Sequence, residues 1–288
     1  MKAKNKRLSI KHQIRAEKER ERRIATAIFS ALILTVIMLS AYFGYTYLNS
    51  QANFVGAAYP FKAVIVDQLS HMFPNNTFIE SVKELLKDAG FTVDYYSSNK
   101  VNVDFFRRLL GEGYSLIILR VHSAQIEGTT QIGFFTSQLY SKTQYIDEQL
   151  SDQVFPATPQ MTARQLFSRN FPVYFAIGPN FIRQTSYTRL GNSIIIAMGC
   201  DSLKYTDTAQ AFIQKGAKVY IGWNGLVSAS HTDKATTQLL RHLIIEKQTI
   251  GQAVENTVKE IGADPTYKSI LEYYPHSSSQ QTIESIVH

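Results

Sequence analysis

Beyond residue 60 the chain alternates between two patterns of apolar and polar residues. Short unbroken apolar runs are typical of strands buried on both faces of a sheet, and longer segments with apolar residues three and four positions apart are typical of amphipathic helices. The predicted strands cover residues 61–67, 91–96, 114–121, 192–200 and 218–225, and the predicted helices cover 76–90, 101–113, 207–217 and, as a pair, 231–263. This alternation with short links predicts a parallel sheet with right-handed crossovers.

The alternation stops between residues 124 and 190. Two strand-like pieces, at 129–140 and 172–182, flank a polar, proline-containing stretch, and this pattern favours hairpins and loops over a further strand–helix unit. Residues 263–288 are polar and show no clear pattern. The sequence therefore predicts one α/β domain over residues 61–262, built around a mostly parallel sheet, followed by a C-terminal extension of uncertain structure.

A different apolar pattern precedes the domain. Residues 24–48 contain no charged residue, and this length is sufficient to cross a bilayer as one helix. Arginines flank its N-terminal end and tyrosines gather at the other, which indicates that the N-terminus stays in the cytoplasm. We therefore expect a basic cytoplasmic tail over residues 1–23, a single-pass signal anchor over 24–48, a stalk over 49–60, and a domain outside the cytoplasm.

Two other interpretations of the anchor segment fit less well. A cleaved signal peptide would have its cleavage site near residues 50–52, but the apolar core of such a peptide is about 7–15 residues long, and this one is far longer. A buried helix of a soluble core would not need basic residues on one side only. An uncleaved anchor agrees with both the length and the flanking charge.

The net charge of +7 comes from the N-terminal tail. Residues 1–23 contain ten Lys and Arg and three Glu, so the remainder of the chain is balanced. A nucleic-acid-binding domain would carry its basic patch on the domain itself. The sequence therefore predicts a membrane partner and no nucleic-acid partner.

Two chemically useful side chains follow predicted strands. His122 follows the strand at 114–121, and Cys200, the single cysteine, ends the strand at 192–200. Ligands of parallel α/β sheets gather beyond the carboxyl ends of the strands, where a thiolate can act as nucleophile, a histidine as its base, and backbone N–H groups can hold an oxyanion. Alone, each residue is more often a packing residue. Together they predict a Cys/His site, provided that the two strands are neighbours.

A resemblance supports this prediction. The stretches "YSLIILRVHSA" and "SIIIAMGCDSL", with the block "AQAFIQKGAKVYIGWNG" after them, resemble the core of the caspase-like cysteine peptidases, above all the gingipain-type branch and the related CHAT domains. The resemblance covers roughly residues 61–261 without the middle third, and it implies a caspase-like three-layer sandwich. It also implies that Cys200 is the nucleophile, that His122 is its catalytic partner, and that the amides of Ser123 and Cys200 form the oxyanion hole. The family usually has glycine where this chain has Ser123.

The resemblance also implies where the substrate side chain binds. In this fold the end of the first strand contributes to that pocket, and Asp67 stands there, while Asp201 follows the predicted nucleophile. Carboxylates in the pocket would favour Lys or Arg substrates through charge-assisted hydrogen bonds; a solvated loop carboxylate is an equally good interpretation of each. No metal site or cofactor is predicted, because neither metal-ligand spacing nor a phosphate-binding glycine loop occurs.

Three functions remain open at this point. The first is a membrane-anchored cysteine peptidase that cleaves a polypeptide substrate outside the cytoplasm. The second is a catalytically inactive relative that binds or scaffolds at the membrane, which Ser123 favours. The third is a sensor domain whose sheet binds a small ligand at the same crevice, with His122 and Cys200 placed there by accident. The third would be favoured if the two strands lay apart in the sheet.

Overall fold

A computed structural model shows the chain as two compact units, residues 1–59 and Pro60–His288. The described residues are 20, 33–42, 61–159, 172–185 and 190–287. In the first unit, residues 33–42 form a helix with exposed side chains. Among the described residues, no helix has the length and apolar character needed to cross a bilayer. Most of the predicted anchor at 24–48, the stalk, and the basic tail except Arg20 lie outside the described residues.

The second unit contains a six-stranded sheet with the strand order β10-β9-β8-β3-β1-β2. Five of its strands are parallel, as the alternating pattern predicts, and β10 is antiparallel to β9. The strands are β1 (Phe61–Asp67), β2 (Phe91–Ser97), β3 (Leu116–Arg120), β8 (Ile194–Ala197), β9 (Val219–Trp223) and β10 (Leu271–Tyr274). All residues of β3, β8 and β9 are buried, as the largely apolar composition of these strands indicates.

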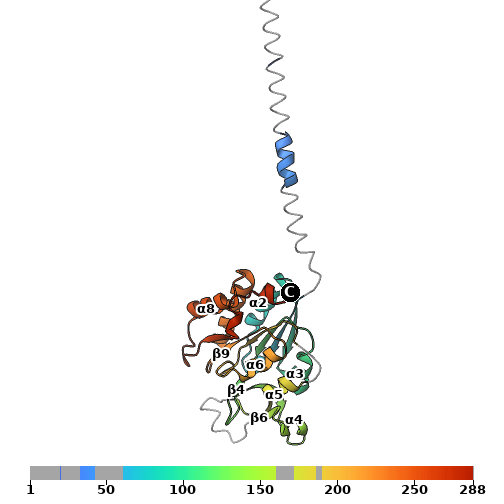
Figure 1. The fold of residues 1–288 in the computed structure, drawn as a ribbon, viewed down its shortest axis with the longest axis vertical. Coiled ribbons are helices and arrows are strands. Elements are labelled where there is room, and N and C mark those ends of the chain that lie inside the picture. The colour runs from blue at the N-terminus through green and yellow to red at the C-terminus, as the bar shows by residue number, and fades with distance from the viewer. Residues whose placement is uncertain (1–19, 21–32, 43–60, 160–171, 186–189, 288) are drawn as a thin grey trace, which may run out of the picture. The chain divides into compact units, whose positions relative to one another are not determined.

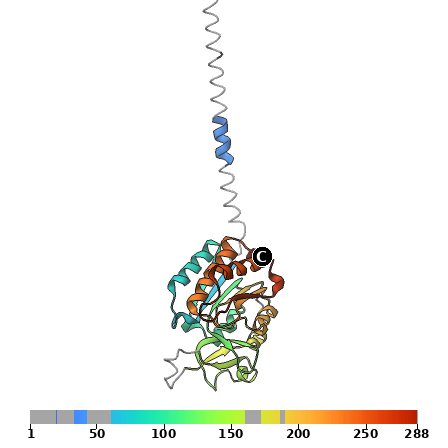
Figure 2. The ribbon, with the colours of Figure 1, turned by 90° about the vertical axis from the view of Figure 1, so that its left-hand side faces the viewer.

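Helices cover both faces of this sheet (Figures 1 and 2). One face packs against α2 (Asn76–Asp88), α7 (Ala229–Leu240), α8 (Ile250–Ile261) and α9 (Ile283–Val287). The other face packs against α3 (Val103–Leu109), α5 (Pro179–Gln184) and α6 (Asp207–Gln214). A π-helical turn, η3 (Arg241–Ile245), joins α7 to the loop before α8. The domain is therefore a mixed α/β fold with a mostly parallel central sheet between helical layers.

The segment that interrupts the sequence pattern forms a second, antiparallel sheet. Its strand order is β4-β5-β7-β6, and the strands are β4 (Ser123–Gln125), β5 (Ile132–Leu139), β6 (Val154–Ala157) and β7 (Tyr174–Ile177). A short helix, α4 (Ile146–Leu150), lies between β5 and β6. Figure 1 shows β4, β6 and α4 together at one end of the domain. Hairpins predicted for this region agree with the antiparallel pairing, and β4 begins directly after His122.

Short 3₁₀ turns follow several strands, at η1 (Gln68–Ser70), η2 (Ser98–Lys100) and η4 (His276–Ser278). The C-terminal residues belong to the same compact unit. They supply β10 to the edge of the large sheet and Ile283 and Ile286 of α9 to its core. The extension thus buries apolar surface of the domain that precedes it.

Register explains how the fold positions the two candidate side chains. Strands β3 and β8 are parallel neighbours, and Leu119 pairs with Ala197 at the end of the ladder. His122 lies three residues after Leu119, and Cys200 lies three residues after Ala197. Parallel strands therefore deliver both side chains to the same edge of the sheet, as the sequence predicts.

Candidate functional site

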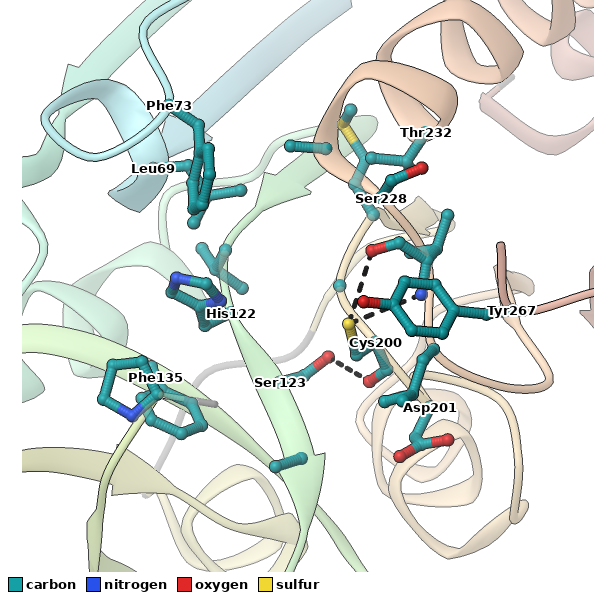
Figure 3. A pocket seen from close by; sticks show the side chains of 18 residues that line it. Leu69, Phe73, His122, Ser123, Phe135, Cys200, Asp201, Ser228, Thr232 and Tyr267 are labelled. Carbon is teal, nitrogen blue, oxygen red and sulfur yellow. Dashed lines mark hydrogen bonds between the residues drawn. The ribbon is translucent and has the colours of Figure 1, made fainter. Parts of the chain in front are cut away.

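His122 and Cys200 line one pocket at the carboxyl ends of β3 and β8 (Figure 3). The pocket has a volume of about 360 Å³, which lies within the range of small-molecule and side-chain binding sites. Its walls come from η1 and the loop after it, from β4 and β5, from the loops after β8 and β9, and from the C-terminal segment around Tyr267. The location is the one expected for a functional site in an open parallel sheet.

The imidazole of His122 is held between two aromatic rings. Its ring centroid lies 6.0 Å from that of Phe73 and 5.8 Å from that of Phe135, and its backbone N–H donates to Gln68 Oε1 at 3.0 Å. The Nε2 atom is buried and has no hydrogen-bond partner among the described residues. Burial lowers the pKa of His122 to about 4. The ring is therefore neutral at neutral pH and can accept a proton.

The thiol of Cys200 contacts the loop after β9. Val227 N–H donates to Sγ and the thiol donates to Val227 O, both at 3.5 Å. Burial raises the pKa of the thiol; the Val227 contact opposes this rise, and the negative charges of Asp201 and Asp264 add to it. The thiol is therefore protonated at neutral pH, and a nucleophilic role requires a base.

The structure brings these two side chains into one pocket without joining them. No hydrogen bond links His122 to Cys200 in the described part of the chain. Figure 3 shows the imidazole on the side of Phe73 and Phe135, and the sulfur on the side of Tyr267. Proton transfer between them therefore needs a side-chain rotation or closure around a substrate, a change that resting enzymes commonly make.

Ser123 ties the two halves of the site together. Its Oγ–H donates to Cys200 O at 2.6 Å, and a Cβ atom on Gly199 would overlap Ser123 Oγ and Val121 O. The Ser123 side chain is therefore hydrogen-bonded to the loop that carries the cysteine. Because Gly199 has no Cβ atom, this loop can approach Ser123 closely. This contact gives a structural role to Ser123, at a position where the sequence resemblance leads us to expect glycine.

The two amides predicted as an oxyanion hole have spare donor capacity. Phe135 N–H donates to His122 O, and Ser123 forms a non-hydrogen-bonded pair with Phe134, so the Ser123 N–H points away from β5. The Cys200 N–H donates to no other residue in the described part of the chain. In the described part of the chain neither N–H has another residue as its acceptor, which is one condition that an oxyanion hole must meet.

Asp201 lies where the sequence places it, in the wall of the pocket. Its backbone has a left-handed φ of 54°, a conformation that Asp and Asn adopt more readily than most residues. Its N–H donates to Gly225 O at 2.8 Å, and the carboxylate lies 4.0 Å from Lys204 Nζ. Figure 3 shows the carboxylate pointing away from His122 and Phe73.

Asp67 is not among the described residues that line this pocket, although its strand-end position led us to expect it there. The residue is 1% exposed, and its carboxylate accepts from Arg120 Nη1 at 2.7 Å and from the Tyr95 hydroxyl at 3.2 Å. The reason is register: Asp67 and Arg120 are directly paired on the neighbouring strands β1 and β3. Burial raises the pKa of the Asp67 carboxyl, and Arg120 opposes the rise.

Arg120 is the centre of a buried network that the sequence analysis did not identify. Besides Asp67, its guanidinium donates to both oxygens of Asp233 at 2.8 and 3.0 Å and to Phe73 O at 2.8 Å. Asn75 Nδ2 donates to the same Asp233. The sequence contains a sign of this network, because a charged residue inside the apolar run "SLIILRV" must have a buried partner.

The wall opposite His122 includes Tyr267, which lies in the C-terminal extension. Asp264 holds this loop: its carboxylate accepts from the N–H groups of Thr266 and Tyr267 and from the N–H and hydroxyl of Ser228. Burial raises the pKa of Asp264, but these hydrogen bonds outweigh it and lower the pKa to about 2. The polar pattern of the extension did not predict that it would contribute to the pocket.

The described residues contain no group of three or more His, Cys, Asp or Glu side chains arranged to hold a metal ion. The pocket itself presents a neutral imidazole, a protonated thiol and backbone N–H groups within a mainly apolar wall.

Comparisons with known proteins give a loose structural match. No protein-family model matches the chain, and no curated protein matches it. Among solved structures, the chain is similar to the Arg-specific cysteine proteinase gingipain R (RgpB), with 10% identity and a TM-score of 0.43 over 78% of this chain and 44% of that one. It is also similar to the complex of the Porphyromonas gingivalis RgpB pro- and mature domains, with 12% identity and a TM-score of 0.40 over 70% and 43%.

The chain spans less than half the length of these two structures. At this degree of superposition the likeness assigns no role to any residue here.

Proposed function

We propose that this protein is a cysteine peptidase in which Cys200 attacks a peptide carbonyl and His122 is the base. One observation supports this most: His122 and Cys200 lie three residues beyond the paired residues Leu119 and Ala197, and both side chains open into one pocket. A coincidence of two packing residues would not require equal offsets from a shared register. The third function considered from the sequence, a sensor that binds a small ligand at this crevice, would be favoured by strands that lie apart, and β3 and β8 are neighbours.

The proposed reaction uses the protonation states described above. Neutral His122 takes the proton from Sγ as the sulfur attacks the carbonyl carbon, and the carbonyl oxygen becomes an oxyanion that accepts from the amides of Ser123 and Cys200. The imidazolium then protonates the leaving amine as the C–N bond breaks, which leaves an acyl-thioester on Cys200. Water, deprotonated by His122, attacks the thioester and releases the acid and the thiol.

Anchoring in a membrane is part of the proposal and is supported by the sequence alone. The charge-free segment 24–48 follows a basic tail, and this combination is typical of a signal anchor with a cytoplasmic N-terminus. The domain would then act on polypeptides outside the cytoplasm. Extraction of membranes at alkaline pH tests the anchoring, since an anchored chain stays in the pellet, and a thiol reagent that cannot cross the membrane tests the side on which Cys200 lies.

The enzymatic test compares the full chain with Cys200→Ala and His122→Asn on a mixed peptide library. We expect cleavage by the parent chain only, and an acid limb of kcat/KM near pH 4, because burial lowers the pKa of His122 to about 4. Cleavage that survives Cys200→Ala would refute the proposal. An acid limb near 6.5, the ordinary value for histidine, would contradict the role of His122 in its observed surroundings.

One set of observations favours a second candidate, a catalytically inactive binding module. The imidazole and the thiol share no hydrogen bond in the described residues, and burial raises the pKa of the thiol. A peptide chloromethyl ketone distinguishes the two candidates. A peptidase is alkylated at Cys200 at a rate that falls at least about 100-fold in His122→Asn, whereas an inactive module is labelled at the same slow rate in both chains.

A further inference from the structure

We propose that the pocket beside Cys200 accepts an uncharged, apolar side chain of the polypeptide substrate and excludes lysine and arginine. This inference rests on the proposed peptidase function and names the substrate class of the same site. It replaces the basic preference that Asp67 and Asp201 suggest from the sequence.

Apolar side chains from separate elements form most of the described wall. Leu69 and Phe73 come from the turn after β1 and the loop beyond it, Phe135 from β5, Met198 from the end of β8, Val227 from the loop after β9, and Tyr267 from the C-terminal segment. A wall assembled in this way removes apolar surface of a bound side chain from water on several sides. An aliphatic or aromatic side chain gains from such burial roughly in proportion to its area.

Three hydroxyl groups of the wall, those of Ser123, Ser228 and Thr232, already have partners. Ser123 Oγ donates to Cys200 O, Ser228 Oγ donates to Asp264, and Thr232 Oγ accepts from Trp223 Nε1. Among the described lining residues, the one carboxylate is that of Asp201. It points away from His122 and Phe73 in Figure 3 and lies 4.0 Å from Lys204 Nζ. The pocket therefore offers a substrate cation no free carboxylate on its apolar side.

The two buried carboxylates behind the wall, those of Asp67 and Asp233, also have a partner within the fold. Asp67 is 1% exposed and Asp233 3%, and both are paired with Arg120, whose guanidinium makes four hydrogen bonds to these carboxylates and to Phe73 O. A substrate arginine would have to displace this internal one, which is held within its own fold at no cost of association. Arg120 thus leaves neither carboxylate free to pair with a basic substrate side chain.

The consequence is a selectivity of stated sign and size. A basic head group in this pocket would lose its hydration without gaining a partner, whereas a leucine or phenylalanine would gain from burial. We expect kcat/KM to be at least about 30-fold higher for Leu or Phe than for Lys or Arg at the residue before the cleaved bond.

The test is a set of fluorogenic peptides that differ only at that residue, with Leu, Phe, Ala, Lys, Arg or Asp, given to the full chain. The expected order is Phe and Leu first, then Ala, with the charged residues last. A preference for Lys or Arg, or equal rates for all six peptides, would overturn the inference while leaving the peptidase function standing.

Binding separates the inference from the failure of the proposed function. If no peptide is cleaved, the same sequences are titrated into Cys200→Ala by calorimetry, where no chemistry is needed. Tighter binding of the Leu and Phe peptides than of the Lys and Arg peptides supports the apolar pocket even in an inactive protein. Tighter binding of the basic peptides, equal binding, or no binding by any of them would overturn it.

A variant pair connects the preference to the wall. Tyr267 is 50% exposed and lines the pocket from a loop fixed by Asp264, so its truncation leaves the core intact. Tyr267→Ala should lower the preference for Phe over Ala by about 3–10-fold, and Tyr267→Phe should retain it, because the ring rather than the hydroxyl forms the wall. Loss of the preference in both variants, or in neither, would contradict the assignment.

Discussion

Asp67 and Asp201 have similar surroundings in the sequence and opposite ones in the structure. Each follows an apolar run at the carboxyl end of a strand of the same parallel sheet. Asp67 is buried and salt-bridged to Arg120, whereas Asp201 lies in the wall of the candidate pocket next to Cys200. A strand-end position therefore places a carboxylate near the crevice but does not determine whether it faces a ligand or another side chain of the fold.

Register with the neighbouring strand makes the difference. Asp67 pairs with Arg120 across β1 and β3, and the guanidinium satisfies it before any substrate arrives. Asp201 lies beyond the end of the β8 ladder, which stops at Ala197, so no strand residue faces it. The comparison predicts that charges around Asp67 determine stability, and that the charge of Asp201 acts on the thiol.

The largest expected effect is that of Arg120→Met. This change leaves the carboxylates of Asp67 and Asp233 buried without their cation, and breaking a buried ion pair in this way costs about 3–5 kcal/mol of unfolding free energy. Urea unfolding of the full chain, followed by circular dichroism, measures the loss.

The matched control is Lys204→Met, which removes the cation that faces Asp201. Since Lys204 is exposed and 4.0 Å from that carboxylate, we expect a loss below about 1 kcal/mol. Similar losses in the two variants would mean that the two carboxylates do not differ in their dependence on a partner.

His122 provides the next largest effect, because it is enclosed without a charged partner among the described residues. Burial lowers its pKa from 6.5 to about 4, so between these values the unfolded chain binds a proton that the folded chain does not. Stability must therefore fall as the pH falls from about 6.5 to 4, by up to about 3 kcal/mol. His122→Asn should flatten this part of the pH–stability curve. An unchanged slope would show that the imidazole is not enclosed in solution.

Asp264 is a third carboxylate in this comparison, and its hydrogen-bond donors are neutral groups rather than a cation. Burial opposes ionisation, but the hydrogen bonds from Ser228, Thr266 and Tyr267 lower its pKa from 3.8 to about 2. Its contribution, about 2 kcal/mol, is present above pH 4 and is lost as the pH falls towards 2. Asp264→Asn should lower stability at neutral pH and reduce the further loss between pH 4 and 2. Parallel curves for the two chains in that window would contradict this assignment.

Much of the fold follows from local pattern, and the comparison shows why parts of the site do not. Apolar runs are a reliable mark of buried parallel strands, so β1, β3, β8 and β9 were predictable, and β2 was predictable from its alternating pattern. The antiparallel pairing of β5 with β7 joins residues about 40 positions apart, and periodicity along one strand does not determine its partner. The polar C-terminal segment gave no sign that Tyr267 would reach the pocket.

The site divides in the same way. His122 and Cys200 were predictable because equal offsets at strand ends follow from parallel topology. Arg120 was not identified, although it interrupts an apolar run. A buried arginine requires a partner, and Asp67 at the end of the adjacent strand is the residue that this requirement indicates. Matching opposite charges at the ends of neighbouring strands would have paired Asp67 with Arg120, and Asp67 would then not have been predicted to line the pocket.

The smallest expected effect tests the comparison of Asp67 with Asp201 most directly. Each carboxylate is replaced by an amide in turn, and the same quantity, the pKa of the Cys200 thiol, is measured in both variants. The negative charge of Asp201 contributes to the raised pKa of the Cys200 thiol, and Asp67 is not among the groups that do so. Asp201→Asn should therefore lower the thiol pKa, and asparagine tolerates the left-handed φ of 54° at this position. Asp67→Asn, the matched control, should leave it unchanged.

The measurement is the rate of alkylation by iodoacetamide as a function of pH, since the thiolate is the reactive form. The midpoint should move to lower pH in Asp201→Asn by a few tenths of a unit, and added salt should reduce the difference between this variant and the parent chain. An equal shift in Asp67→Asn would mean that the buried carboxylate also acts on the sulfur. The division between a carboxylate that stabilises the fold and one that acts on the site would then not hold.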